Sequence, residues 1–142
     1  MSTTRQNILS QIQTDIVAIT SAEVAVFKSV QCKQPGIPDI EKNEYPCVFI
    51  YTGPEKRVED PSRAVIGYET WDWTVMIEVW SKESTMETLL SLIHSALFAD
   101  YTLGQNAVLC RRSGVDTWVL DPEHDWCSMV IPYLITYRHT QG

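Results

Sequence analysis

The sequence predicts one α+β domain: a mainly antiparallel β-sheet of four to five strands, with two α-helices packed on one face and a long β-hairpin arm. Two segments have apolar residues at helical spacing, and several others alternate apolar and polar residues as half-buried strands do. The order of these segments lacks the repeated strand, helix, strand unit of a parallel sheet. Since 142 residues with 44% hydrophobic content suffice for a substantial core, we expect residues 1-142 to form a single domain.

The first predicted helix runs from Thr4 to about Thr20, with Thr3 or Thr4 supplying the N-cap oxygen. Its apolar residues fall close to one stripe of a 3.6-residue helix. The stripe consists of Ile8, Leu9, Ile12, Ile16, Val17 and Ile19. We expect this stripe to pack on the sheet.

Two strands separated by a loop follow this helix. The segment from Glu23 to Val30 alternates approximately, with three valines on one face, and predicts a short strand. Residues 33–44 are rich in proline and glycine and predict a loop. The dense β-branched and aromatic run from Tyr45 to Thr52 predicts a buried strand, whose proline stands at the start, where a missing N–H is tolerated.

The segment from Gly53 to Gly67 is the most polar stretch away from the termini, and its charges cancel. Its charged residues are Glu55, Lys56, Arg57, Glu59, Asp60 and Arg63. Loops longer than about 12 to 15 residues are uncommon in compact domains and are usually functional or disordered. Two interpretations stay open: a solvated hairpin loop, or an assembly arm that a partner orders.

The run from Glu69 to Trp80 predicts a long strand with one buried face. That face carries Trp71, Trp73, Val75, Ile77 and Val79. At about 3.3 Å per residue the strand would span roughly 40 Å, which is longer than usual, so we expect part of it to extend past the core. Trp71 and Trp73 are expected in the core, whereas Trp80, on the opposite face, suits a core position or a contact with another subunit equally well.

A second helix is predicted from the capping-box spacing of Ser84 and Glu87 to about Asp100. Its expected core stripe is Met86, Leu89, Leu90, Ile93, Leu97 and Phe98. Residues 107–112 and 115–120 predict two short strands around a tight turn at Ser113 and Gly114. The last strand is predicted from about Trp126 to Arg138, at an edge or with a bulge, because Pro132 lies inside it.

Composition and charge argue against several classes of function. A net charge of −7 argues against a nucleic-acid binder, because neutralising phosphates needs clustered lysine and arginine. No apolar run approaches the roughly 18 to 20 residues of a membrane span, and the polar start lacks a secretory signal, so we expect no membrane association and folding in the cytoplasm. The cysteines lack zinc-site spacing and are expected to be buried free thiols, with a disulfide or metal role as the alternative. They are Cys32, Cys47, Cys110 and Cys127.

Chemistry-bearing residues are sparse. The one grouping that suggests a metal or base site is Asp121, Glu123, His124 and Asp125, and an acidic turn is the favoured interpretation. His94 and His139 are expected at the surface, and the sequence contains no nucleophile elbow or phosphate loop. We therefore predict no enzyme, no catalytic residue, no metal and no cofactor.

Several segments in their order resemble one known family. They are a helix opening with Arg5-Gln-Asn-Ile-Leu, a strand entered through Tyr45-Pro-Cys-Val, a long tryptophan-rich strand after a charged loop, a helix ending in Ala96-Leu-Phe-Ala-Asp-Tyr-Thr-Leu-Gly104, and a closing strand Met129-Val-Ile-Pro-Tyr-Leu-Ile-Thr-Tyr137. Together, over nearly the whole chain, they look like the tail terminator (tail completion, tail-to-head joining) proteins of long-tailed bacteriophages. The resemblance lies in element order and local patterns and not in a signature motif.

This resemblance implies a small α+β virion protein that forms a ring, usually a hexamer, on the last turn of the tail tube. The ring would stop tube growth, offer a docking face to the head connector and let DNA pass without specific binding. Its partners would be itself, the tail tube protein and the head connector or neck protein. It would lie in the tail or neck of the virion after assembly in the host cytoplasm.

The expected surfaces follow from the arm and from the nearest approach to a basic patch. The predicted subunit interface is Glu55, Lys56, Arg57, Glu59, Asp60, Arg63 and Trp80. Arg111 and Arg112 are ordinary solvated charges or a docking surface. Two alternatives stay open: another neck component, such as a head-completion or connector-adaptor protein, and a small metal-dependent hydrolase that uses His124 with Asp121 or Asp125.

Overall fold

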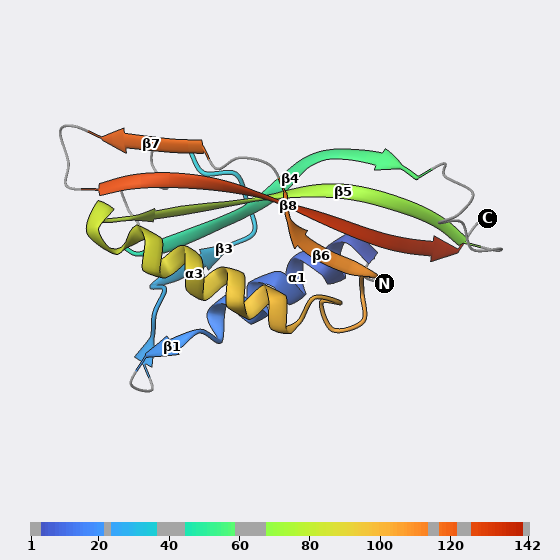
Figure 1. Cartoon of the computed structure of the whole chain (residues 1–142), viewed down its shortest axis with the longest axis horizontal. Helices are drawn as coiled ribbons and strands as arrows, with labels where there is room; N and C mark the ends of the chain where they lie inside the picture. The colour runs from blue at the N-terminus through green and yellow to red at the C-terminus, as the bar shows by residue number, and fades with distance from the viewer. Residues whose placement is uncertain are drawn as a thin grey trace.

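The computed structural model describes residues 4–21, 24–36, 45–58, 68–113, 117–121 and 126–140. Both helices lie on one face of a twisted β-sheet (Figure 1), which confirms the predicted α+β fold class. The helices are α1 (Thr4–Val17) and α3 (Glu83–Ala99). The strands are β1 (Thr20–Ser21), β2 (Val24–Ala25), β3 (Ser29–Gln31), β4 (Cys47–Arg57), β5 (Tyr68–Ser81), β6 (Leu109–Arg112), β7 (Thr117–Asp121) and β8 (Trp126–Thr140).

The main sheet has the strand order β3-β4-β5-β8-β6, and β7 pairs with β8 beside β6, which makes six strands among the described residues. All neighbours are antiparallel except β3 and β4, which run parallel. The long pairing of β5 with β8 extends from Tyr68 opposite Thr140 to Ser81 opposite Cys127. These two strands therefore form the axis on which the other elements are arranged.

The core lies between the sheet and the two helices. Helix α1 contributes Ile8, Ile12 and Ile16, and β5 contributes alternate residues from Trp73 to Val79, all of them buried. The alternation agrees with the predicted buried face, since successive strand residues point to opposite sides. Trp73 is 2% exposed and Trp71 is half-buried against the core, so the prediction that both are core residues is confirmed.

Three predicted elements differ near the N-terminus. Helix α1 ends at Val17 and not near Thr20, and its start at Thr4 leaves the N-cap position to Thr3, outside the described residues. The predicted continuous strand from Glu23 to Val30 is wrong. The chain forms the short β1–β2 pair, buries Phe27 in the core and only then enters β3, because the Lys28 N–H bonds to the Pro46 carbonyl (2.8 Å) and aligns β3 with β4.

The predicted capping box of the second helix is also wrong. Strand β5 continues to Ser81, so α3 begins at Glu83 with Lys82 as its N-cap, and Ser84 is already helical. The Thr85 hydroxyl donates to the Lys82 carbonyl (3.1 Å) and lies 2.9 Å from the Ser81 hydroxyl. The helix end near Asp100 is as predicted.

Strand β8 is central and its register against β5 is continuous through Pro132, so both the edge position and the alternative bulge predicted from Pro132 are wrong. It pairs with β5 on one side and with β6 and β7 in succession on the other. The Ser113 N–H donates to the Pro132 carbonyl (2.8 Å), which shows that the Pro132 backbone faces the junction between β6 and β7. A proline is tolerated there because its missing N–H falls where no ladder hydrogen bond is required.

The predicted loop from Gly53 begins later than expected, because β4 continues to Arg57. Its register against β5 shifts between Thr52 and Glu55, and the ladder then resumes with Glu55 opposite Trp73 and Arg57 opposite Trp71. A Cβ on Gly53 would lie 2.9 Å from the Thr74 carbonyl oxygen, so this bulge requires glycine. Residues 59–67 lie outside the described residues.

Candidate functional site

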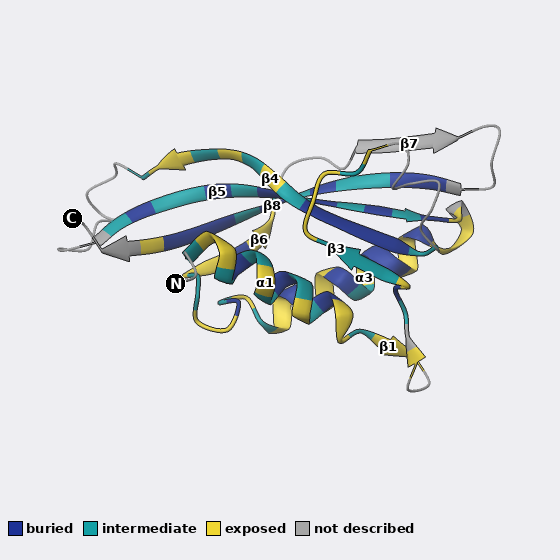
Figure 2. Cartoon of the chain, turned by 180° about the vertical axis from the view of Figure 1, so that it is seen from behind, coloured by how far each residue is buried: buried dark blue, intermediate teal, exposed yellow. Residues whose placement is uncertain are grey.

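The most prominent feature is a three-stranded extension of the sheet, which we call the arm: residues 53–57 of β4, 68–73 of β5 and 135–140 of β8. It extends beyond the C-terminal end of α3 and past the start of α1 (Figure 1). Figure 2 shows exposed residues on β4 toward the tip of the arm. The predicted overlong strand thus becomes part of a projecting ribbon.

The arm has two strand edges that differ from each other. Strand β3 pairs only with Cys47–Phe49 of β4, so among the described residues no strand borders β4 from residue 50 to 57. On the other side β6 pairs with β8 only as far as Thr136, and no described strand borders residues 137–140 there. Strand edges of this kind present backbone donors and acceptors that can pair with another chain.

Ion pairs and hydrogen bonds brace the arm. The Arg57 Nη2 atom lies 3.8 Å from Glu69 Oε1, and the Trp71 indole N–H donates to Glu69 Oε2 (3.3 Å). At the base of the arm Arg5 Nε of α1 lies 3.6 Å from Glu55 Oε2. Glu55 and Arg57, two of the predicted interface residues, are therefore engaged within the chain.

Tyr137 is the buried anchor of the arm. It is 2% exposed, and its ring meets that of Trp73 edge to face with centroids 6.2 Å apart. Burial, followed by the charge of the nearby Glu55 carboxylate, raises the pKa of Tyr137 to about 12. The phenol is therefore neutral at physiological pH, and the arm is joined to the core by packing as well as by the Arg5–Glu55 pair.

Trp80, also predicted for the interface, lies away from the arm. It is opposite Cys47 of β4 and Ser128 of β8, at the far end of β5, on the face that carries no helix. Its indole N–H donates to Glu78 Oε2 (2.6 Å), and the Tyr51 hydroxyl donates to Glu78 Oε1 (2.9 Å).

Burial and then the Glu78 charge raise the pKa of the Cys47 thiol to about 12, so this thiol is protonated and a poor nucleophile.

Of the remaining four predicted interface residues, only Lys56 lies within the described residues. Lys56 lies in β4 opposite Asp72, on the arm. Glu59, Asp60 and Arg63 lie outside the described residues.

The suggested metal or base site cannot be assembled from the described residues. Asp121 ends β7, while Glu123, His124 and Asp125 lie outside the described ranges, as does the side chain of His139. Within those ranges no three His, Cys, Asp or Glu side chains gather as metal ligands would. None of the described helices is long and apolar enough to cross a bilayer.

The cysteines are free thiols. Cys47, Cys110 and Cys127 are buried, as predicted, but Cys32 is exposed, so the prediction fails for Cys32. Cys32 directly follows β3, and its thiol donates to the Leu9 carbonyl of α1 (3.7 Å).

A carboxyl pair joins α1 to the segment after α3. The Gln11 side-chain amide donates to Asp15 Oδ1 (2.9 Å) and to Asp100 Oδ2 (3.3 Å), and the Gly104 N–H donates to Asp100 Oδ1 (3.0 Å). Burial, followed by the hydrogen bond with Asp100, raises the pKa of Asp15 to about 7. Asp15 therefore changes charge near neutral pH, whereas the Cys110 thiol, whose pKa is raised to about 12 by burial and then by these two carboxyls, stays protonated.

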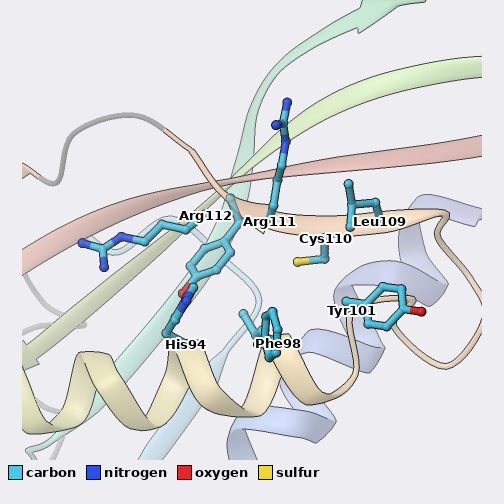
Figure 3. Close-up of a pocket in the computed structure, with 9 residues that line it drawn as sticks. His94, Phe98, Tyr101, Leu109, Cys110, Arg111 and Arg112 are labelled. Atoms are coloured by element: carbon cyan, nitrogen blue, oxygen red, sulfur yellow. The ribbon is translucent and has the colours of Figure 1, made fainter. Parts of the chain in front are cut away.

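The structure also contains a groove of about 490 Å³ between α3, the segment after it and β6 (Figure 3). Phe98, predicted in the core stripe, is 73% exposed at its wall, so that prediction is wrong. Leu97 already fills the core-facing position, and the next residue along a helix points about 100° away from it. His94, exposed as predicted, lies one turn earlier, with its ring centroid 6.4 Å from that of Phe98.

Arg111 and Arg112, the predicted docking residues, stand on this groove and are exposed. The sequence prediction missed the groove itself. A usable signal was present: the second helix has apolar residues at both 97 and 98, a stripe wider than one sheet face covers, and aromatic and apolar residues follow at Tyr101 and Leu109.

Comparison with known proteins identifies no family. No protein-family model matches the chain, and no curated protein sequence matches it. Among solved structures, a chain of a particle described as "Virion of native gene transfer agent (GTA) particle" is similar, with 14% identity over 92% of this chain and 94% of that chain and a TM-score of 0.43. A similarity of this size assigns no function to the chain.

Proposed function

We propose that the chain is a structural virion protein that forms a ring, with six subunits as the expected number, on the end of a phage tail tube. The ring ends tube growth and presents a docking face to the head connector. The sequence resemblance described above suggested this role. The observation that carries it is the arm, with its two different strand edges.

Two unlike edges on one subunit suit a ring. If the β4 edge of one copy pairs with the β8 edge of the next, every copy uses both edges and the contact is head-to-tail. Head-to-tail contacts close into rings when the rotation between subunits allows it. The edge-to-edge hydrogen bonds supply affinity in the same way as strand addition does in peptide recognition.

The charge of the chain supports the same role. A net charge of −7 per subunit would give a hexameric ring a strongly acidic character. An acidic lumen in this ring would repel the DNA backbone and let the duplex pass without adhering.

Light scattering after size-exclusion chromatography, followed by negative-stain imaging, tests ring formation. We expect closed rings in solution, or rings that form only on the ends of tubes assembled from the cognate tail tube protein. A monomer at every concentration that also fails to bind these tubes would refute the proposal. Binding to the connector but not to the tube would instead favour another neck component.

A further inference from the structure

The segment of residues 100–107, which follows α3 and leads toward β6, has a backbone conformation that its own residues disfavour. Leu103, Gly104 and Gln105 have φ angles of 49°, 65° and 69°, and two of these three residues are not glycine. A positive φ is unfavourable for a residue with a side chain, so such a conformation persists only where its surroundings hold it. One anchor is the Leu103 side chain, which is fully buried in the core.

The second anchor is the Asp100 carboxyl group. The Gly104 N–H donates to Asp100 Oδ1 (3.0 Å), and the Gln11 side-chain amide of α1 donates to Asp100 Oδ2 (3.3 Å). The same Gln11 amide donates to Asp15 Oδ1 (2.9 Å). A Cβ on Gly104 would lie 2.9 Å from Gln11 Oε1, which shows how closely the segment approaches the helix. Two carboxyl groups and one amide therefore join segment 100–107 to α1.

This contact does not satisfy both carboxyl groups when they are ionised. Asp15 Oδ2 is buried and accepts no hydrogen bond from the described residues. In the described part of the chain, neither Asp15 nor Asp100 has an ion-pair partner. The groups that face Asp15 are Gln11 from α1, Asp100 from the segment and the uncharged Cys110 thiol from β6. A proton on Asp15 would replace the repulsion between two carboxylates by a hydrogen bond to Asp100.

The same segment supports β6 and the groove. The Tyr101 carbonyl accepts a hydrogen bond from the Cys110 N–H (2.7 Å), and the Thr102 carbonyl accepts one from the Ala107 N–H (3.0 Å). Tyr101 and Cys110 both line the groove (Figure 3). If the segment moved away from α1, the bond to β6 would break and the Cys110 thiol would be uncovered.

We propose that Asp15 and Asp100 form a proton-operated latch that closes segment 100–107 against α1. One proton shared by the two carboxyl groups holds the latch closed at acidic pH. Loss of this proton leaves two carboxylates in contact, and their repulsion opens the segment while the rest of the sheet stays folded. The inference does not depend on ring formation.

The direction of the pH dependence follows from the closed state. Burial and the hydrogen bond to Asp100 raise the pKa of Asp15 from 3.8 to about 7 when the latch is closed. The closed state therefore binds the proton more tightly than the open state does. Closure is favoured most below about pH 4 and is lost progressively as the pH rises to about 7.

Hydrogen exchange of backbone amides measures the opening. The protection factor corrects for the faster intrinsic exchange at high pH. For Gly104, Ala107 and Cys110 it should fall about tenfold between pH 5 and pH 8, allowing for solvent screening. At pH 8 these amides should exchange faster than those of the β5–β8 pairing, because a local opening needs less free energy than global unfolding. The carboxyl carbon of Asp15 should titrate in the NMR spectrum with a midpoint of about 7.

Three variants test the role of the two carboxyl groups. In D15N the side chain keeps its shape, cannot ionise and can donate to Asp100 at every pH, so protection should be equal at pH 5 and pH 8. D100N still offers an oxygen to the Gly104 N–H but removes the repulsion, so the fall should be smaller than in the unmodified chain. The matched control E87Q removes an exposed carboxylate of α3 outside this contact and should show the full fall.

Several results would overturn the proposal. Equal protection at both pH values in the unmodified chain would do so, as would an undiminished fall in D15N or in D100N. If the segment exchanged no faster than the β5–β8 amides at either pH, it would open only when the whole chain unfolds. Recovery of protection at pH 8 on addition of about 1 mM calcium chloride would assign the carboxyl pair to a cation in place of a proton.

Discussion

The backbone of β8 at Arg138 permits a direct test of the proposed ring contact. The Ser113 N–H donates to the Pro132 carbonyl, and the Val108 N–H donates to the Thr136 carbonyl, both on the β6 side of the strand. Alternate residues of a strand direct their backbone groups to the same side. The Arg138 N–H therefore points to that side too, past the end of β6. The substitution R138P removes this donor and leaves the ladder to β5 intact.

The expected effect is small for one subunit and large for a ring. A hydrogen bond contributes about 1 kcal/mol net, so each contact weakens about fivefold. Over the six contacts of a hexamer this compounds to about 10⁴-fold. R138P should therefore be monomeric, and fail to bind tube ends, at concentrations where the unmodified chain forms rings.

The control variant is R138A, which removes the same side chain but keeps the N–H. It should form rings as the unmodified chain does, as measured by light scattering and negative-stain imaging. The melting temperature of R138P should stay within a few degrees of that of R138A, because the lost donor bonds to no described strand within the subunit. If R138P formed rings over the same range of concentrations as R138A, the strand-pairing argument would be refuted.

Three further predictions concern stability and reactivity. Because the pKa of Asp15 is raised to about 7, the folded state holds its proton more tightly than the unfolded state does. This carboxyl therefore makes stability fall as the pH rises from about 4 to about 7. Between pH 5 and pH 8, the free energy of unfolding measured with urea should fall by about 1 to 2 kcal/mol less in D15N than in the unmodified chain, allowing for solvent screening. An equal fall in the two chains would contradict this prediction. G53A should lower the free energy of unfolding by about 1 to 3 kcal/mol, because its Cβ would crowd the Thr74 carbonyl; an unchanged thermal midpoint would disprove the crowding. A thiol reagent should modify Cys32 first, since the other cysteines are buried, and C32S should abolish the fast phase; a fast phase that survives in C32S would contradict the burial pattern.

Much of the fold could be predicted from periodicity alone. The stripe of Ile8, Ile12 and Ile16 and the alternation along β5 each report which side of an element is buried. Periodicity predicted the wrong element between Glu23 and Val30, where the alternation is weak. The capping-box spacing at Ser84 also predicted the wrong helix start, because β5 continues to Ser81. Local sequence gives element type better than element ends, because ends depend on contacts with distant segments.

The candidate sites were predicted less completely. Lys56 and Arg57 do lie on the arm, but Trp80 lies at the end of β5 away from the arm, because residues far apart along an extended strand are also far apart in space. The groove around Phe98 was not foreseen at all. A helical stripe shows which side chains face the sheet but not where the sheet ends.

The sequence by itself determined the α+β class, the two amphipathic helices, the overlong strand and the shortage of chemistry-bearing motifs. These are local properties, set by side-chain spacing and composition. Only the tertiary structure decided that Pro132 lies in a central strand, that β4 continues into the arm with two different edges, and that Phe98 forms the wall of a groove. Each of these depends on which distant segment lies alongside, and the pairing of distant segments is set by the packing of the whole chain.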